Sequence, residues 1–375
     1  MIKWDEIELD YGIREDILKK ITHVPGEPEM KESESAFLCG LINKYNPKVV
    51  TEVGIASGAT SAIMLNCLSK LGGKRVLNSI DYSKEFYRDN SKTSGFLGSE
   101  AYEIIDNDEI QHNILLGDVA CVHESYIKES DMVVIDTVHS LPGEVLDFLT
   151  ILPILKNGTV VVLHDVAWHL KGRLDFTYAT GLLYSNVCAE VKYINHDNNR
   201  YPNIAAFVID DNTHRNIDDL FLSLTVTWAY IPDKRQIDEY RASLNRYFDK
   251  RQVEFFDEIL RMQKMVYASK NKLFRFPYAS IEPNDRVIIY GAGAVGKEYY
   301  RQAKVSNCCE IIAWVDKKYE SMPTLRVDSL DALNTMDYDY VIIAIENEET
   351  VSEVKIELLE MGIPENKIKW NNPRK

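Results

Sequence analysis

Short apolar runs alternate with amphipathic stretches through the first half of the chain, and this alternation predicts a parallel β-sheet. The runs are strand-sized and lack a polar alternation, as is typical of strands that are buried on both faces. The strands we expect cover residues 49–53, 75–80, 113–116, 132–135 and 160–163. The helices we expect around them cover residues 33–45, 59–71, 100–107 and 143–155. Strands that alternate with helices indicate a doubly wound α/β domain with helices on both faces of its sheet.

Two further strand candidates, 190–194 and 204–209, follow one another without a helix between them. Parallel neighbours need a long crossover connection, whereas antiparallel neighbours can be joined directly. We therefore expect a hairpin here, which gives the sheet an antiparallel edge.

Residues 233–272 differ from the segments on either side, because they are rich in charge and contain neither glycine nor proline. Apolar residues recur there at a spacing of three to four, which predicts one or two amphipathic helices. Two interpretations stay open. The apolar face packs against the flanking domains, or it pairs with a second copy of the chain and forms a homo-oligomer.

A second alternation of strands and helices begins at Asp285. The strands we expect there cover residues 287–290, 310–315, 340–345 and 367–370. This part is too short for a complete six-stranded dinucleotide-binding fold, so we expect a small Rossmann-like α/β domain. A length of 375 residues also suits more than one domain, at about 150 residues each. We divide the chain into an N-terminal domain over 1–230, a helical connector over 231–280 and a C-terminal domain over 281–375.

The composition is that of a globular protein, and its charge narrows the classes of partner. The chain is 45% apolar, and 43 Lys and Arg residues against 58 Asp and Glu residues give a net charge of −15. A field of this sign repels phosphate backbones and anionic lipid, so we expect neither nucleic acid nor a membrane as a partner. The six cysteines form no CxxC pair, and no apolar run reaches the roughly 18 residues of a membrane-spanning helix. With acidic residues where a signal peptide needs an apolar core, these features favour the reducing cytoplasm.

The first candidate binding site follows the strand at residues 49–53. The strand ends with Glu52, and Gly54 and Gly58 then form a tight loop that leads into a helix. Glycines let a ligand lie against the backbone, and the first turn of a helix offers free N–H groups to an anion. No lysine follows the last glycine, as it would in a phosphate-binding loop. A carboxylate held by N–H groups and by the hydroxyl of Ser57 or Thr60 fits better, with Glu52 facing an ammonium group.

Two more acidic residues follow the next strands of the same sheet. Asp81 ends the second strand, where an acid is placed to accept hydrogen bonds from two ribose hydroxyls. Asp118 follows the third, where its carboxylate could accept from the amino group of an adenine. The three loops together describe a ligand with an amino acid, a ribose and an adenine. S-adenosylmethionine has these three parts.

The second candidate site lies at the ends of strands four and five. Asp136 and His139 follow the fourth strand, and His164 and Asp165 follow the fifth. Since adjacent parallel strands end at the same edge of a sheet, these side chains converge where open α/β sheets hold ligands. Two carboxylates with an imidazole can bind a divalent cation. Carboxylates favour Mg²⁺ or Mn²⁺, and His164 as a ligand shifts the preference toward Mn²⁺, iron or zinc.

With ExGxxxG over residues 52–58, Asp81, Asp118 and the DxxH and HD pairs in this order, residues 30–210 resemble class I S-adenosylmethionine-dependent methyltransferases. The resemblance is to the metal-dependent macrolide-sugar and catechol-type O-methyltransferases. It implies a seven-stranded sheet with a reversed last strand, Asp136 and Asp165 as metal ligands and His139 as the general base. His164 stands where some members carry a carboxylate ligand, and Thr137 replaces a usual glycine. The activity implied is methyl transfer to a hydroxyl of a small polar acceptor, a sugar or a glycosylated metabolite.

The C-terminal domain carries a glycine motif of its own. Gly291, Gly293 and Gly296 fit GxGxxG between a strand and a helix, and Asp316 ends the next strand. This part resembles the small Rossmann-like units appended to some sugar-modifying methyltransferases and sugar acyltransferases. Two roles stay open: binding of a nucleotide or nucleotide-sugar, and a purely structural or oligomerising role.

Other functions compete with O-methylation. A metal-free N- or C-methyltransferase would use the same cofactor loops. A binding protein that senses a nucleotide through residues 291–296, without turnover, belongs to a different class, as does an oxidoreductase that binds NAD there. We also expect residues 82–98 to form a lid over the site, and residues 168–184 to form one wall of the acceptor pocket.

Overall fold

The computed structural model describes residues 3–4, 6–22, 30–171, 177–195, 202–270, 272–322 and 325–374. The chain divides into two compact units, Met1–Phe256 and Asp257–Lys375, and each is described here by itself.

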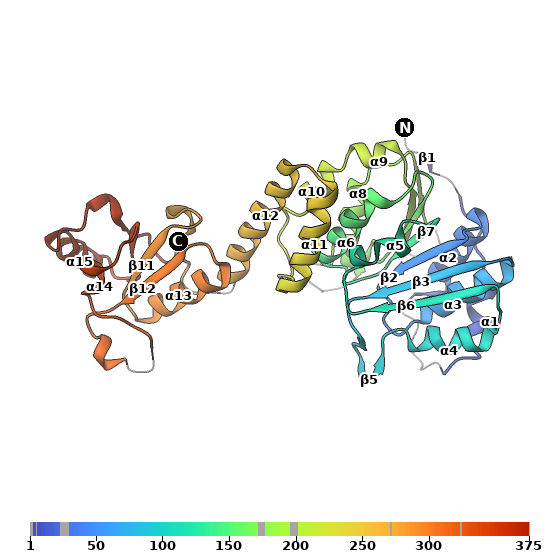
Figure 1. Cartoon of the computed structure of the whole chain (residues 1–375), viewed down its shortest axis with the longest axis horizontal. Helices are drawn as coiled ribbons and strands as arrows, with labels where there is room; N and C mark the ends of the chain where they lie inside the picture. Colours follow the sequence, from blue (N-terminus) through green and yellow to red (C-terminus); the bar gives the residue numbers. More distant parts are fainter. Residues whose placement is uncertain are drawn as a thin grey trace. The chain divides into compact units, whose positions relative to one another are not determined.

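The first unit is built on one mixed sheet, which has eight strands in the described ranges (Figure 1). The strands are β1 Lys3–Trp4, β2 Val49–Val53, β3 Arg75–Asp81, β6 Ile110–Leu116, β7 Met132–Ile135, β8 Val160–His164, β9 Val191–Ile194 and β10 Ile204–Val208. Their order is β1-β9-β10-β8-β7-β2-β3-β6. Without the two-residue β1, this is a seven-stranded sheet whose last strand is reversed, so the predicted fold class is confirmed.

The reversed strand does not lie where the sequence placed it. β10 lies between β8 and β9 and runs antiparallel to both. The predicted hairpin is confirmed, because β9 and β10 pair antiparallel, but the reversed strand does not form the edge of the sheet. The described edges belong to β1, which is parallel to β9, and to β6.

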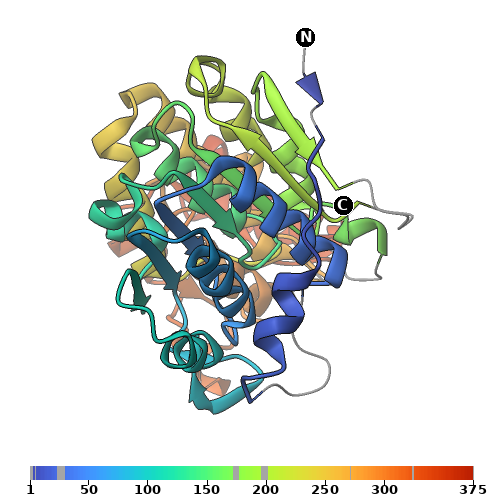
Figure 2. The ribbon, with the colours of Figure 1, turned by 90° about the vertical axis from the view of Figure 1, so that its right-hand side faces the viewer.

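Helices cover both faces of this sheet (Figures 1 and 2). On one face lie α1 Gly12–Leu18, α2 Glu32–Tyr45, α3 Ala59–Leu71 and α4 Phe96–Ile105, whose apolar residues share one buried core with the sheet. The other helices are α5 Glu124–Ile127, α6 Gly143–Ile151, α7 Trp168–Lys171, α8 Ala179–Asn186, α9 Asp211–Arg215, α10 Asp218–Ser223 and α11 Lys234–Tyr247. Among these, α8, α10 and α11 pack on α6. A small hairpin, β4 Glu85–Phe86 with β5 Asp89–Thr93, follows β3.

The helices predicted over residues 233–272 are present as α11 and α12 Lys250–Ser269. α11 begins at a capping box, in which the Asp233 side chain accepts from the Gln236 N–H and the Gln236 side chain accepts from the Asp233 N–H. The apolar residues Ile237, Tyr240 and Leu244 of α11 are buried. The boundary between the two units falls within α12.

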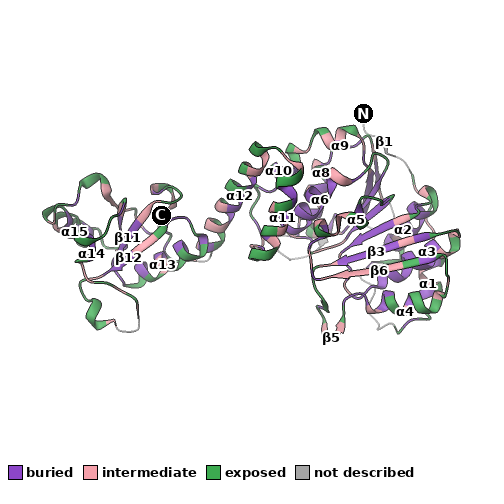
Figure 3. Cartoon of the chain, in the orientation of Figure 1, coloured by how far each residue is buried: buried purple, intermediate pink, exposed green. Residues whose placement is uncertain are grey.

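The second unit holds a four-stranded parallel sheet in the order β12-β11-β13-β14. Its strands are β11 Arg286–Tyr290, β12 Glu310–Val315, β13 Tyr340–Ile343 and β14 Ile368–Lys369. Its helices are α13 Ala294–Ser306, α14 Ala332–Thr335 and α15 Glu348–Glu360. The middle strands β11 and β13 are almost wholly buried (Figure 3), and a separate apolar cluster lies on each face of the sheet. In the described part of the chain, no helix is both long enough and apolar enough to cross a bilayer.

Candidate functional site

A cavity of about 470 Å³ opens at the carboxyl ends of β2, β3 and β7 in the first unit. Its described lining includes the glycine loop after β2, the start of the β4–β5 hairpin, the turn after β6 and the segment after β7. The residues predicted for a site that line it are Gly54, Ser57, Thr60, Asp81, Asp118, Asp136 and His139. One cavity thus brings together most of the two candidate sites. Glu52, Gly58, His164 and Asp165 are absent from the described lining.

The glycine loop has the backbone that its sequence predicts. Gly54 (φ +90°) and Gly58 (φ +87°) adopt the left-handed conformation that favours glycine. A Cβ on Gly54 would lie 2.1 Å from the Asp136 carbonyl oxygen, and one on Gly58 would lie 2.7 Å from the Gly98 nitrogen. Glycine is therefore required at both positions. The loop leads directly into α3, whose first turn, with Ala59 and Thr60, lines the cavity.

Glu52 lies in the core beneath this loop. It is 1% exposed, and Ser61 Oγ donates a hydrogen bond of 2.5 Å to its carboxylate. Burial raises the pKa of Glu52 to about 8, although hydrogen bonds from Ser61 and Ser79 act to lower it. The position suits a residue that supports the loop and the start of α3. The expected contact between Glu52 and a ligand ammonium group stays a prediction.

Asp81 fastens the glycine loop from the neighbouring strand. Its Oδ2 accepts hydrogen bonds from the Ile55 N–H (2.9 Å) and the Ala56 N–H (3.2 Å), and its Oδ1 accepts from the Ser83 N–H (2.8 Å). The carboxylate is at the cavity wall. Each carboxylate oxygen has more than one lone pair, so Asp81 can hold the loop and still accept from a ligand hydroxyl.

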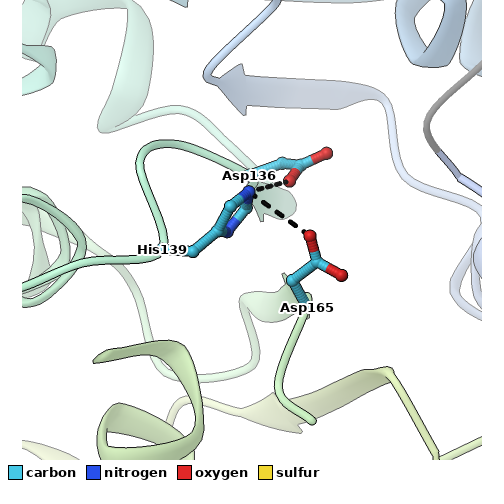
Figure 4. Close-up of side chains that lie close together, drawn as sticks. All are labelled: Asp136, His139 and Asp165. Atoms are coloured by element: carbon cyan, nitrogen blue, oxygen red, sulfur yellow. Dashed lines mark ion pairs between the residues drawn. The ribbon is translucent and has the colours of Figure 1, made fainter. Parts of the chain in front are cut away.

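Figure 4 shows Asp136, His139 and Asp165 around one point. Nε2 of His139 lies 3.5 Å from Asp136 Oδ1 and 3.4 Å from Asp165 Oδ2. One ligand atom from each residue lies within 4.8 Å of the others. Because oxygen and nitrogen donors bind Mg²⁺, Mn²⁺ or Zn²⁺ at about 2.1 Å, neighbouring donors around one ion stand about 3 Å apart. The donor set fits a divalent cation.

His164 as a metal ligand stays a prediction, and its Nδ1 lies 3.1 Å from Asp136 Oδ1 and 3.7 Å from Asp165 Oδ2. It is 2% exposed, and its Nε2 lies 3.2 Å from Glu34 Oε2. Burial acts to lower the pKa of His164, but Asp136, Glu34 and Asp165 outweigh it and raise the pKa well above the ordinary value. Both ring nitrogens of His164 therefore have a carboxylate partner, one of which is Asp136. His139 is the imidazole that forms a cluster with Asp136 and Asp165.

Asp136 is correspondingly kept ionised. Burial acts to raise the pKa of its carboxyl, but the charge and hydrogen bond of His164, together with His139, leave it below the ordinary value. An ionised carboxylate is the form that binds a cation.

The backbone of His139 is fixed by a hydrogen bond to Glu144, and its ring packs against Trp168. Its backbone has φ +51°, a left-handed conformation that is strained for a non-glycine residue. Glu144 Oε2 accepts from the His139 N–H (3.0 Å) and from Thr137 Oγ1 (2.8 Å), and lies 3.8 Å from His139 Nδ1. Thr137, which departs from the usual glycine, thus helps to place Glu144. The ring of Trp168 packs edge-on against His139 at 4.8 Å.

Helix α11 contributes to the site, which the sequence did not indicate. Tyr240 and Gln236 line the cavity, and the Tyr240 hydroxyl donates to Asp147 Oδ1 at 2.8 Å. Burial raises the pKa of Asp147 to about 7, since the hydrogen bond from Tyr240 only partly offsets it. Asp118, expected at an adenine, is engaged by Arg235 of α11. The amphipathic spacing of these residues predicted a packed helix, but it did not indicate which surface of the domain this helix covers.

The segments predicted as a lid and as an acceptor wall each contribute residues to the cavity lining. The hairpin within residues 82–98 borders the cavity through Tyr82, Ser83, Glu85, Tyr87 and Ser94. Whether it closes as a lid stays a prediction. Of the predicted acceptor wall, Trp168 lines the cavity, while residues 172–176 lie outside the described part of the chain.

The glycine motif of the second unit repeats the device seen at Asp81. Gly291 has φ +103°, and a Cβ on Gly296 would lie 1.9 Å from the Gly291 carbonyl oxygen. Asp316 Oδ2 accepts from the Ala292 N–H at 2.7 Å, and the same Gly291 carbonyl accepts from Trp314 Nε1 at 2.8 Å. The loop is therefore tightly packed against β12.

Comparisons with known proteins give one family match within each of the two units. Residues 51–166 match a family model described as a methyltransferase domain, and residues 283–369 match one described as C2185-like, N-terminal. No curated protein matches the chain. With the strand order of the sheet, the first match shows that the first unit has the class I methyltransferase fold.

Several solved structures resemble the first unit. An O-methyltransferase from Bacillus cereus, in complex with S-adenosylhomocysteine, is 13% identical over 52% of this chain and 90% of its own, with a TM-score of 0.35. TomG from Streptomyces achromogenes, an O-methyltransferase of tomaymycin synthesis in complex with S-adenosylmethionine, is 13% identical over 54% and 92%, with a TM-score of 0.36. The methyltransferase PaMTH1 from Podospora anserina is 14% identical over 64% and 78%, with a TM-score of 0.31.

Proposed function

We propose that the first unit transfers a methyl group from S-adenosylmethionine to a hydroxyl of a small polar acceptor, a sugar or a glycosylated metabolite. The observation that carries the proposal is the meeting of the glycine loop and Asp81 with Asp136 and His139 in one cavity. The first pair suits the donor, and the second suits a hydroxyl that must lose its proton.

The donor would lie along the loop after β2. The start of α3 offers N–H groups to the carboxylate of its methionine part, with the Ser57 and Thr60 hydroxyls nearby. Oδ2 of Asp81 already accepts from Ile55 and Ala56, but Oδ1 accepts only from the Ser83 N–H and retains a lone pair for a ribose hydroxyl. The methyl group then faces the segment that carries His139.

His139 is our candidate for the general base. An alcohol has a pKa far above 7, so its proton must leave as the new bond forms. The hydroxyl oxygen attacks the methyl carbon, the bond from that carbon to sulfur breaks, and the electron pair returns to sulfur, which becomes a neutral thioether. Nε2 of His139 accepts the proton. Glu144 Oε2 lies 3.8 Å from Nδ1 on the opposite side of the ring, where an ionised carboxylate would stabilise the positive charge that the ring gains, although burial raises the pKa of Glu144.

The carboxylates of Asp136 and Asp165 would hold a divalent cation, Mg²⁺ or Mn²⁺. A bound cation lowers the pKa of a hydroxyl and orients its oxygen. In this assignment His139 Nε2 stays free for the proton, because a single lone pair cannot ligate a cation and accept a proton at once. His164 holds the Asp136 carboxylate in place by a hydrogen bond to its Oδ1. Asn203 holds the Asp165 carboxylate by donating a 2.5 Å hydrogen bond to its Oδ1.

The lining of the cavity supports a polar acceptor. Glu85 offers a carboxylate there and Tyr230 a hydroxyl beside an aromatic face, while Tyr240 and Asp147 are bonded to each other. Such a mixture suits an acceptor with several hydroxyl groups.

The test is calorimetry with S-adenosylhomocysteine, followed by methyl transfer to a panel of sugars, glycosides and catechols with Mg²⁺, Mn²⁺ or EDTA. We expect binding, and turnover that EDTA abolishes. Asp165→Asn should lower turnover at least about 100-fold while leaving S-adenosylhomocysteine affinity unchanged. The matched control, Glu129→Gln, alters an exposed carboxylate that pairs with Lys156 away from the cavity.

The rival functions give different results. Turnover that survives EDTA, or an amine acceptor, would favour the metal-free N- or C-methyltransferase. Binding of S-adenosylhomocysteine without turnover on any acceptor would favour a sensing protein. Absence of binding would refute the proposal.

A further inference from the structure

Helix α11 lies over the end of the cavity that is formed by the turn after β6. Gln236 and Tyr240 reach the lining from this helix. At its start, Asp233 Oδ2 accepts a 2.6 Å hydrogen bond from the Tyr82 hydroxyl, which belongs to the loop after β3. The helix therefore joins the two loops between which we place the adenine.

Two side chains of α11 occupy the polar groups of the turn after β6. The Arg235 guanidinium donates to Asp118 Oδ1, and Arg235 Nε donates to Glu239 Oε1 at 2.8 Å. The other oxygen of Glu239 accepts from the Val119 N–H at 3.3 Å. Asp118, Arg235, Glu239 and Val119 thus form a closed ring of donors and acceptors.

The chemistry of this ring matches that of an adenine edge. Adenine presents an amino donor, N6, beside a ring acceptor, N1, and proteins read bases through such edges. Asp118 followed by the Val119 N–H offers the complementary acceptor and donor. In the structure, Arg235 takes the place of the amino group as donor to Asp118, and Glu239 takes the place of N1 as acceptor from the Val119 N–H.

We propose that Arg235 and Glu239 compete with the adenine of the cofactor for Asp118 and the Val119 amide, so that α11 is an autoinhibitory latch on the cofactor site. The proposal rests on the function proposed above. A latch of this kind multiplies the intrinsic affinity for the cofactor by the fraction of molecules in which it is open, and so lowers the apparent affinity. Because Arg235 is 54% exposed and Asp118 is 30% exposed, the contact is weak enough to exchange.

The experiment is calorimetry of the full chain with S-adenosylhomocysteine, whose uncharged sulfur limits any direct effect of removing a positive charge. Arg235→Ala should tighten binding about three- to fivefold, since an exposed ion pair contributes up to roughly that factor. Glu239→Ala, which frees the Val119 amide, should also tighten it. The matched control is Arg246→Ala. Arg246 is 62% exposed on the same helix and pairs with Glu124, which is outside the described cavity lining.

The outcomes separate the latch from the proposed function. Tighter binding by Arg235→Ala and Glu239→Ala, with Arg246→Ala unchanged, supports the latch. Unchanged or weaker binding by the first two variants overturns it and leaves the methyltransferase proposal intact, because the cofactor still binds. If neither the natural chain nor the variants bind S-adenosylhomocysteine, both proposals fail.

Discussion

Replacing Glu52 by glutamine should flatten the pH dependence of the first unit's stability. Burial raises the pKa of this carboxyl from 4.5 to about 8 in the folded state. Between these two values the folded chain keeps a proton on Glu52 that the unfolded chain releases. Stability is therefore greatest below the unfolded pKa and falls as the pH rises toward about 8, where the folded state also loses the proton.

The size of the effect follows from the same shift. Each pH unit inside the window changes the free energy of unfolding by at most about 1.4 kcal/mol per group. Raising the pH from about 5 to about 7 should therefore cost the natural chain about 2–3 kcal/mol through Glu52 alone. Glutamine can accept the same hydrogen bond from Ser61, so Glu52→Gln removes this term while keeping the contact.

The assay is urea unfolding of the natural chain and of Glu52→Gln at several pH values, with circular dichroism as the signal. Other titrating groups contribute equally to both, so the informative quantity is the difference in unfolding free energy between variant and natural chain. That difference should grow in favour of the variant as the pH rises. The control, Glu129→Gln, replaces a carboxylate that is 63% exposed and should give a constant difference. A difference for Glu52→Gln that does not change with pH would refute the argument that Glu52 is buried as a neutral acid.

Two further predictions concern the two glycine loops. Asp81→Asn should weaken S-adenosylhomocysteine binding about tenfold, because it replaces the charged acceptor proposed for the ribose, and calorimetry measures this; an unchanged affinity would place the ribose elsewhere. Gly296→Ala should destabilise the second unit by about 1–3 kcal/mol, because its Cβ would meet the Gly291 carbonyl oxygen at 1.9 Å. Gly293→Ala is the matched control, since a Cβ there meets nothing within 4 Å, and equal thermal melts of both variants would contradict the packing argument.

The sequence was most informative where burial alone decides the element. β7 begins and ends at the predicted residues, because a strand that is buried on both faces leaves a continuous apolar run. The bounds of β2 also match, although its sequence includes the polar residues Thr51 and Glu52. Boundaries shifted where a single residue acts. α4 begins at Phe96, four residues before the prediction, because Gly95 adopts φ +82° and starts the helix. The place of β10 depended on long-range pairing, which its own residues do not reveal.

The candidate site shows the same division. Strand ends placed Asp81, Asp136 and Asp165 at one edge, because parallel strands end together. The sequence gave His139 the role of base and His164 that of a metal ligand, but it could not show the surroundings of either ring. Their difference comes from Glu34, which reaches His164 from helix α2, 130 residues away in the chain. The role of α11 was hidden for a similar reason, because its contacts with Asp118 join residues more than 100 positions apart.

In both units, an acidic residue at the end of a neighbouring strand accepts hydrogen bonds from a glycine loop. Asp81 holds the loop after β2, and Asp316 holds the loop after β11. A loop tied down in this way has already given up much of its conformational entropy during folding, so a guest need not bear that cost on arrival. We expect such loops to act as rigid templates. Their selectivity would then come from the side chains of the surrounding segments, and variation in what the protein accepts should map to those segments and leave the glycines untouched.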